Sequence, residues 1–348
     1  MKVTKKLKKL LESISLQTKL TIGFIALLLL LFNAFVWIGA ILSIPHYPFF
    51  IGLVAIAYGL GLRHAVDPDH IAAIDNTTRK LIHDGKKPIA TGLFFSLGHS
   101  TIVVLLSLLI IFSSTFIQHN LPSFKQTGSI IGTIISGLFL FLVGLINTLI
   151  LINLFKVLQH TKKGELYTDI SINKYLDNRG LLARILKPLL KTVSNSWNMY
   201  PVGLLFGLGF DTASEVALLS LSATTSIRDI PYFIILLLPL SFTAGMTLID
   251  TLDGIVMLGA YGWAYINPRR KLYYNIIIVF LSVAVAFFVG GIEMIQIISN
   301  QTGFLSIINQ IKLDNFGFFI ITAFILCWGV TFLITKMKKD YEKSSKSI

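Results

Sequence analysis

The stretch RHAVDPDHIAAIDN, residues 63–76, places one arginine, two histidines and three aspartates between strongly apolar segments. Ionisable side chains inside a bilayer cost about 2.5–3.5 kcal/mol each on insertion scales, so they face a protein interior or a water-filled path and mark a functional site. Imidazole and carboxylate are also common ligands of divalent metal ions. The stretch therefore predicts a metal-binding site within a membrane domain.

The composition of the whole chain agrees with a membrane domain. Of 348 residues, 54% are hydrophobic and only 14% are charged, whereas soluble domains are about one quarter charged. We therefore expect an all-α polytopic membrane protein. The single cysteine, Cys327, excludes a disulfide within the chain and a cysteine-rich metal site.

Eight apolar runs are each long enough to cross roughly 30 Å of hydrocarbon as a helix. We predict spans at residues 20–42, 49–74, 89–112, 128–155, 201–223, 232–258, 276–299 and 316–334. The first run is too long for the core of a signal peptide and has no convincing cleavage site, so we expect it to remain in the protein. The predicted organisation is a basic segment at 1–19, a transmembrane domain at 20–335 with a long cytoplasmic loop at 156–200, and a basic tail at 336–348.

The positions of lysine and arginine predict the orientation. The formal net charge of +13 would also suit nucleic-acid binding. However, 26 of the 30 basic residues fall in the two ends and the alternate loops that share one side of the predicted membrane. The positive-inside rule therefore places both termini in the cytoplasm, with the lipid bilayer and not a nucleic acid as the surrounding partner.

A weak internal repeat relates spans two and three to spans five and six. Gly59 and Gly61 align with Gly207 and Gly209 at an offset of 148, and FSLGHS at 95–100 aligns with FTAGMT at 242–247 at an offset of 147. Because three helices separate the copies, they would insert in opposite orientations. Such inverted repeats build a central site in many secondary transporters.

Acidic residues in the spans outnumber the one basic residue there, Arg63. A divalent metal would supply the missing positive charge. On a continuous helix His64, Asp67 and His70 are spaced three apart and share one broad face, so we expect them to be direct ligands. The further predicted metal-site residues are Asp69, which would orient an imidazole, His99, which would complete the ligands, and Asp211, Glu215, Asp250 and Asp253, which would attract the ion or balance its charge.

Pro68 lies between the two aspartates of this group. Proline has no N–H, so we expect a kink and a His64 carbonyl that has lost its helical partner. Such a carbonyl could accept a bond from Arg63 or water, or contact a cation.

These residues resemble the signatures of the nickel/cobalt transporter family. The pattern of a histidine, four residues and then Asp-His is similar to 64–70 here. Further family blocks resemble SLGHSTIVV at 96–104, LGFDTASE at 208–215, GMTLIDTLDG at 245–254 and AYGWAY with PRRKLYYN within 260–275. The chain departs from the family at Pro68, where alanine is expected.

The resemblance implies eight helices with both ends inside, and uptake of Ni²⁺ or Co²⁺ across the cytoplasmic membrane by a secondary permease, not an enzyme. The metal would be the substrate, and no cofactor is expected. No G-x-x-x-x-G-K-[ST] motif occurs, so we expect no direct use of ATP, and no ATPase subunit is evident. The alternatives are a nickel/cobalt efflux permease, an intramembrane metal-dependent hydrolase and a Mg²⁺-dependent lipid transferase.

Overall fold

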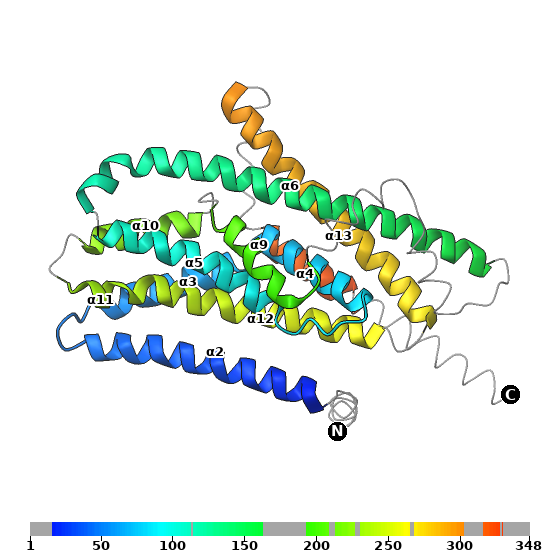
Figure 1. The fold of residues 1–348 in the computed structure, drawn as a ribbon, viewed down its shortest axis with the longest axis horizontal. Coiled ribbons are helices and arrows are strands. Elements are labelled where there is room, and N and C mark those ends of the chain that lie inside the picture. The colour runs from blue at the N-terminus through cyan, green and yellow to red at the C-terminus, as the bar shows by residue number, and fades with distance from the viewer. Residues whose placement is uncertain are drawn as a thin grey trace.

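The computed structural model describes residues 16–112, 114–162, 193–208, 213–226, 230–264, 268–302, 316–327 and 329. Within these residues all regular structure is helical and no strand occurs (Figure 1). Helices are the expected form for apolar spans, because hydrocarbon offers no partner for an unpaired backbone N–H or C=O. The all-α prediction is confirmed for this part of the chain.

Five helices are long and apolar enough to cross a membrane: α2 (Leu16–Ser43), α5 (Thr91–Phe112), α6 (Ser114–Lys162, through its section Ile130–Gln159), α12 (Leu237–Ala264) and α13 (Pro268–Thr302). A sixth span results if α3 (Phe50–His64) and α4 (Pro68–His83) are counted together. The described residues thus have the architecture of a multi-pass membrane protein. A shorter apolar helix, Phe316–Cys327, occupies the start of the eighth predicted span.

The second predicted span, expected over 49–74 as one helix with a kink at Pro68, consists of two separate helices. Helix α3 ends at His64, and α4 begins at Pro68 and runs on to His83, with a bend of 53° between them. Asp67 precedes α4 with φ −65° and ψ 143°, which is an extended conformation. The residue before a proline is pushed towards that conformation, and proline is favoured at the first position of a helix. Pro68 therefore opens a new helix instead of kinking an existing one.

Two further boundaries differ from the prediction. Helix α6 starts at Ser114 and continues to Lys162, so the region expected to become a loop at residue 156 is still helical there. Most of the predicted loop, 163–192, lies outside the described residues. The fifth predicted span is divided into α9 (Met199–Phe206), which follows the short 3-10 helix η1 (Ser196–Asn198), and α10 (Ala213–Ser226). A short helix, α11 (Tyr232–Ile235), precedes α12.

Glycines allow the helices around the centre to approach closely. A Cβ atom on Gly61 of α3 would overlap the carbonyl oxygen of Phe242 in α12, and one on Gly203 of α9 would overlap the carbonyl oxygen of Phe95 in α5. Small residues at such crossings are the usual means by which membrane helices pack backbone to backbone. Helix α12 also contacts α4 and α5, and α10 contacts α3 and α5. These helices together surround one buried centre.

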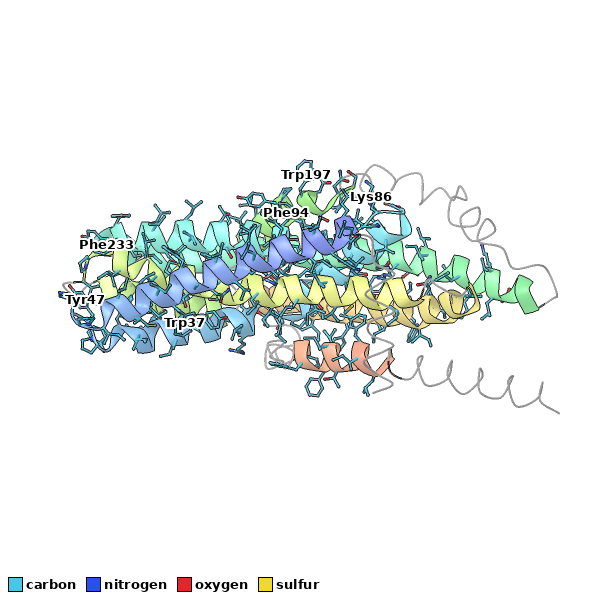
Figure 2. The ribbon with its side chains drawn as sticks, turned by 90° about the horizontal axis from the view of Figure 1, so that it is seen from below. Trp37, Tyr47, Lys86, Phe94, Trp197 and Phe233 are labelled. Carbon is cyan, nitrogen blue, oxygen red and sulfur yellow. The ribbon has the colours of Figure 1, made fainter. Side chains whose placement is uncertain are left out.

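Lysine side chains link α4 and the residues after it to the segment that precedes α9. Figure 2 shows Tyr47 and Phe233 at one end, and Lys86 and Trp197 towards the other end of α2. The ammonium groups of Lys80 and Lys86 donate to the carbonyls of Val193 and Ser194, and Lys86 also bonds to Asn195 at 3.2 Å. These bonds tie the α4–α5 connection to the segment that precedes α9.

Candidate metal site

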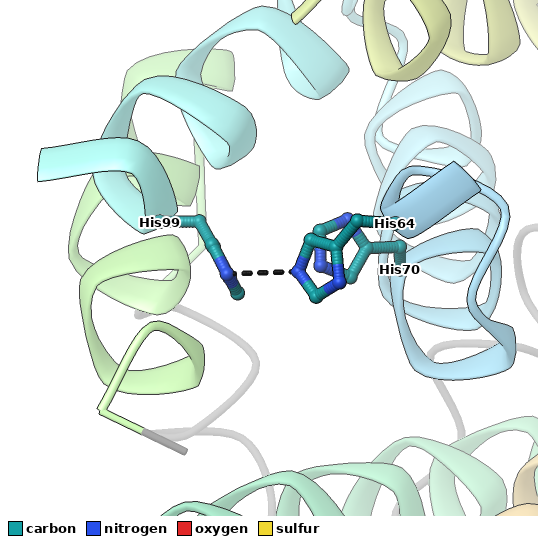
Figure 3. A group of neighbouring side chains, drawn as sticks. All are labelled: His64, His70 and His99. Atoms are coloured by element: carbon teal, nitrogen blue, oxygen red, sulfur yellow. Dashed lines mark hydrogen bonds between the residues drawn. The ribbon is translucent and has the colours of Figure 1, made fainter. Parts of the chain in front are cut away.

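Three histidines from three helices meet at the buried centre (Figure 3). His64 ends α3, His70 lies in the first turn of α4, and His99 lies within α5. Their exposed fractions are 1%, 0% and 2%. One ring nitrogen from each lies within 4.8 Å of the other two, which makes the group a candidate metal site.

The helix break is what brings His64 and His70 together. Six residues along a straight helix correspond to a rotation of roughly 240°, which would direct the two side chains to different faces. Here the ring centroids are 4.6 Å apart. His64 and His70 therefore meet, but not on one continuous helix face as predicted.

Backbone groups at the break between α3 and α4 have hydrogen-bond partners. The carbonyl of His64 accepts a hydrogen bond from the amide of Asp67 at 3.0 Å, so it is not freed by Pro68 as the sequence predicted. The amide of His70 donates to Asp69 Oδ1 at 2.9 Å. In a continuous helix that amide would instead bond to Val66. Asp69 thus holds the first turn of α4.

His64, His99 and Glu215 form the tightest part of the site. The Nε2 atoms of His64 and His99 are 2.9 Å apart, and Glu215 Oε1 lies 2.7 Å from His99 Nε2 and 3.8 Å from His64 Nε2. Metal–nitrogen bonds of about 2.1 Å place neighbouring ligands of a square-planar or octahedral ion roughly 3 Å apart. The separation of the two imidazoles therefore matches an adjacent pair of ligands.

Two aspartates lie against the other nitrogens of the histidine rings. Asp67 Oδ2 is 3.0 Å from His64 Nδ1, and Asp250 Oδ2 is 3.3 Å from His70 Nδ1. A carboxylate at one ring nitrogen fixes the orientation of the imidazole and leaves the other nitrogen for a metal. In agreement with this, His70 Nε2 is buried and has no hydrogen-bond partner among the described residues.

Two predicted residues are placed less directly. Asp253 lies one turn beyond Asp250 on α12, and its Oδ2 is buried without a hydrogen-bond partner in the described part of the chain. Asp211 lies within 209–212, outside the described residues. The structure therefore brings together seven of the nine predicted residues in or against the histidine group, namely His64, Asp67, Asp69, His70, His99, Glu215 and Asp250.

Sequence reasoning assigned no role to the aromatic walls of the site. The ring of Phe242 lies 5.4 Å from that of His64, and the ring of Phe95 lies 4.8 Å from that of His70. Apolar walls limit the entry of water and strengthen electrostatic interactions inside a site. The signal was present, because Phe95 and Phe242 occupy equivalent positions in the two aligned segments.

A second buried polar group lies outside the histidine cluster. Asp75 Oδ2 accepts a hydrogen bond from Ser282 at 2.8 Å and lies 3.8 Å from Arg79 Nη2. The amide of Asn147 and the guanidinium of Arg79 both donate to Asn76. This group joins α4 to α6 and α13 and accounts for the polar residues that extend past the predicted end of the second span.

Known sequences with the same features are transport proteins. The family described as "High-affinity nickel-transport protein" (NicO) matches residues 50–334. The chain is 46% identical over 319 residues to the "High-affinity nickel transport protein" of Cupriavidus necator, which covers 90% of this chain and 91% of that protein. It is 46% identical over 301 residues to "Nickel transporter NicT" of Mycobacterium tuberculosis, covering 84% and 81%.

A relative named for cobalt is also similar. The "Cobalt transport protein NhlF" of Rhodococcus rhodochrous is 39% identical over 295 residues, which covers 82% of this chain and 83% of that protein. No solved structure matches the chain. The family match spans most of the sequence and includes every histidine and carboxylate of the site, so this chain belongs to the NicO family of high-affinity nickel-transport proteins, a family of transporters and not of enzymes.

Proposed function

We propose that this protein is a secondary permease that takes up Ni²⁺, Co²⁺ or both across the cytoplasmic membrane. The observation that carries the proposal is the buried group of three imidazoles and the Glu215 carboxylate, which would hold a partly dehydrated divalent ion between helices. The names of the relatives, which specify nickel and cobalt transport, support the same substrates. The metal is the cargo of the protein, and no resident cofactor is part of the proposal.

The imidazoles and the carboxylates take different roles in this proposal. His64, His70 and His99 bind the ion, and Glu215 adds a fourth ligand or neutralises one of its charges. Asp67 and Asp250 orient imidazoles, in keeping with their positions at Nδ1. Asp69 positions His70 through the hydrogen bond that it accepts from the His70 amide, and Asp211 and Asp253 attract the ion or balance its charge. Imidazole and carboxylate ligands without a thiolate suit Ni²⁺ and Co²⁺ better than Cu⁺.

The proposed topology has eight spans with both termini in the cytoplasm, a transmembrane domain at 20–335 between the basic ends 1–19 and 336–348, and a cytoplasmic loop within 156–200. The arrangement of helix ends supports it. Five helix ends point towards the same end of the bundle: the start of α2, the ends of α4, α6 and α12, and the start of α13 (Figure 1). The basic residues of the sequence lie next to these positions. An inside-negative membrane would then favour entry of a dication by roughly 4.6 kcal/mol per 100 mV.

We also propose that α3 and α5 are related to α9 and α12 as an inverted repeat. A Cβ on Gly245 of α12 would clash with the carbonyl of Tyr58 in α3, and a Cβ on Gly98 of α5 would clash with the carbonyl of Tyr200 in α9. The contacts of Gly61 and Gly203 described above form a second matching pair. The equivalent helices α3 and α9 run in opposite directions in Figure 1.

These matched crossings favour a different register from the one aligned in the sequence. Tyr58 and Tyr200 are 142 positions apart, whereas Gly98 and Gly245 are 147 apart. The first helix of each repeat is therefore offset by 142 residues instead of 148. In this register His64 is equivalent to Phe206, and the ring pair His64–Phe242 at 5.4 Å is matched by Phe206–Phe95 at 5.3 Å.

Accumulation of ⁶³Ni²⁺ by cells that express the protein tests the proposal, with Co²⁺, Zn²⁺ and Mn²⁺ as competitors. We expect accumulation above that of empty cells, competition by Co²⁺, and loss of accumulation in His64→Ala and Asp250→Ala at matched protein levels. Accumulation below that of empty cells would identify an exporter. Accumulation unaffected by both substitutions would reject the site assignment.

A further inference from the structure

Gly317 lies against the break between α3 and α4 and is not itself one of the proposed metal ligands. Gly317 lies in the first turn of the helix Phe316–Cys327, which lies beside α4 as the orange-red helix in Figure 1. A Cβ atom on Gly317 would overlap the carbonyl oxygen of Val66 and would lie 2.7 Å from its carbonyl carbon. The helix therefore touches the backbone of the break itself.

The break is the element that sets the distance between His64 and His70. Only Ala65, Val66 and Asp67 separate the two helices, and Asp67 also contacts the His64 ring. Any displacement of the Val66 peptide thus changes the relation between two proposed ligands. The effect is direct, because His64 is the last residue of α3 and His70 lies in the first turn of α4.

The packing around the contact is continuous and apolar. Val66, Ile71 and Ala72 form one buried cluster with Ile320 and Phe324 of the Phe316–Cys327 helix. The helix is thereby fixed along α4, and it cannot withdraw from Val66 without losing this packing. A side chain at position 317 would have to move backbone, which cannot yield as a flexible side chain would.

We propose that Gly317 is a positioning residue for the metal site: it lets the Phe316–Cys327 helix press on Val66 and so holds the α3–α4 break in the geometry that brings His64 and His70 to one ion. The proposal rests on the proposed function, because it concerns the same site. Outer residues that orient metal ligands typically change affinity by 10–100-fold when altered. We expect a change of that size here.

The test is equilibrium binding of ⁶³Ni²⁺ to the purified full-length protein, expressed per folded molecule, together with the KM of uptake. Gly317→Ala should raise the Kd and the KM by about 10–100-fold. Gly144→Ala is a control for milder crowding between two other membrane helices, since its Cβ would meet the side chains of Ala286 and Phe287 at 3.3 Å between α6 and α13. Gly52→Ala on α3, which would meet nothing within 4 Å, controls for the substitution itself.

We expect Gly144→Ala to change the Tm without changing the Kd, and Gly52→Ala to resemble the unsubstituted protein. A wild-type Kd for Gly317→Ala, or an equal rise for Gly144→Ala, would overturn the proposal. If Gly317→Ala yields no folded protein, Val66→Ala keeps the carbonyl but loosens the side-chain packing that holds the Phe316–Cys327 helix against the break, without creating an overlap. A several-fold rise in Kd then supports the proposal, and an unchanged Kd rejects it. Absence of Ni²⁺ binding by the unsubstituted protein would instead reject the proposed function.

Discussion

Replacement of Glu215 by glutamine removes one negative charge from the site while keeping the size of the side chain. An ion held by His64 and His99 would lie within about 4 Å of this carboxylate, given the 2.7 Å and 3.8 Å distances to their nitrogens. At that distance and an effective dielectric constant near 20, two unit charges interact by roughly 4 kcal/mol, so a dication would lose roughly 8 kcal/mol. The net effect is smaller, because the carboxylate already pairs with His99 at 2.7 Å and gives up part of that interaction when the ion binds.

The expected net loss is about 2–4 kcal/mol, or a rise of about 30- to 1,000-fold in the Kd for Ni²⁺. Equilibrium binding to purified protein measures the Kd, and ⁶³Ni²⁺ uptake at several concentrations measures the KM. Glu293→Gln is the matched control, because Glu293 is also buried in a membrane helix but accepts a hydrogen bond from Ser136 of α6 at 2.8 Å. Equal effects of the two substitutions would refute the idea that Glu215 acts on the ion.

Three further substitutions test other parts of the structure. Asp250→Asn keeps a hydrogen-bond acceptor near His70 but removes the charge. It should raise the KM for Ni²⁺ by about 10–100-fold while leaving the amount of protein in the membrane unchanged. A KM within about two-fold of the unsubstituted value would contradict the orienting role. Pro68→Ala should leave the Kd for Ni²⁺ unchanged and lower the Tm slightly, since proline at the first helical position contributes about 0.4–1 kcal/mol to the free energy of unfolding. Uptake at saturating metal shows whether the transport rate changes as well. Gly61→Ala should destabilise the protein by about 1–3 kcal/mol through overlap with the Phe242 carbonyl, measured by thermal unfolding, whereas Gly59→Ala on the same helix, with nothing within 4 Å, should not.

Much of the site was accessible from the sequence because ionisable residues are so unfavourable in apolar segments. His64, His70 and His99 stand out for this reason alone, and so do Glu215 and Asp250. The prediction of how His64 and His70 meet was wrong, because it assumed one helix over 49–74. Pro68 fixed the place of the interruption, but a kink within a helix and the start of a new helix have the same local signature.

Helix lengths were less accessible. Helix α6 extends beyond both predicted ends of the fourth span, since hydropathy marks the apolar section of a helix and not its continuation into polar surroundings. The proposed repeat differs in register from the sequence alignment, because Gly61 and Gly203 make equivalent close contacts, whereas Gly59 has nothing within 4 Å of an added Cβ and its aligned partner Gly207 lies against His99. Glycine-rich segments align in several registers, and only the contact across the helices selects one.

The sequence by itself determined that this is an all-helical membrane protein with imidazole and carboxylate groups in its interior, because periodic composition and the cost of burying charge depend only on residue type and order. The tertiary structure decided which groups face one another. It placed Glu215 at the two Nε2 atoms of His64 and His99, Asp67 and Asp250 at the outer nitrogens, and Gly317 against the break between α3 and α4. These relations join residues up to 251 positions apart, from Val66 to Gly317, and they arise from the packing of whole helices, which no local pattern encodes.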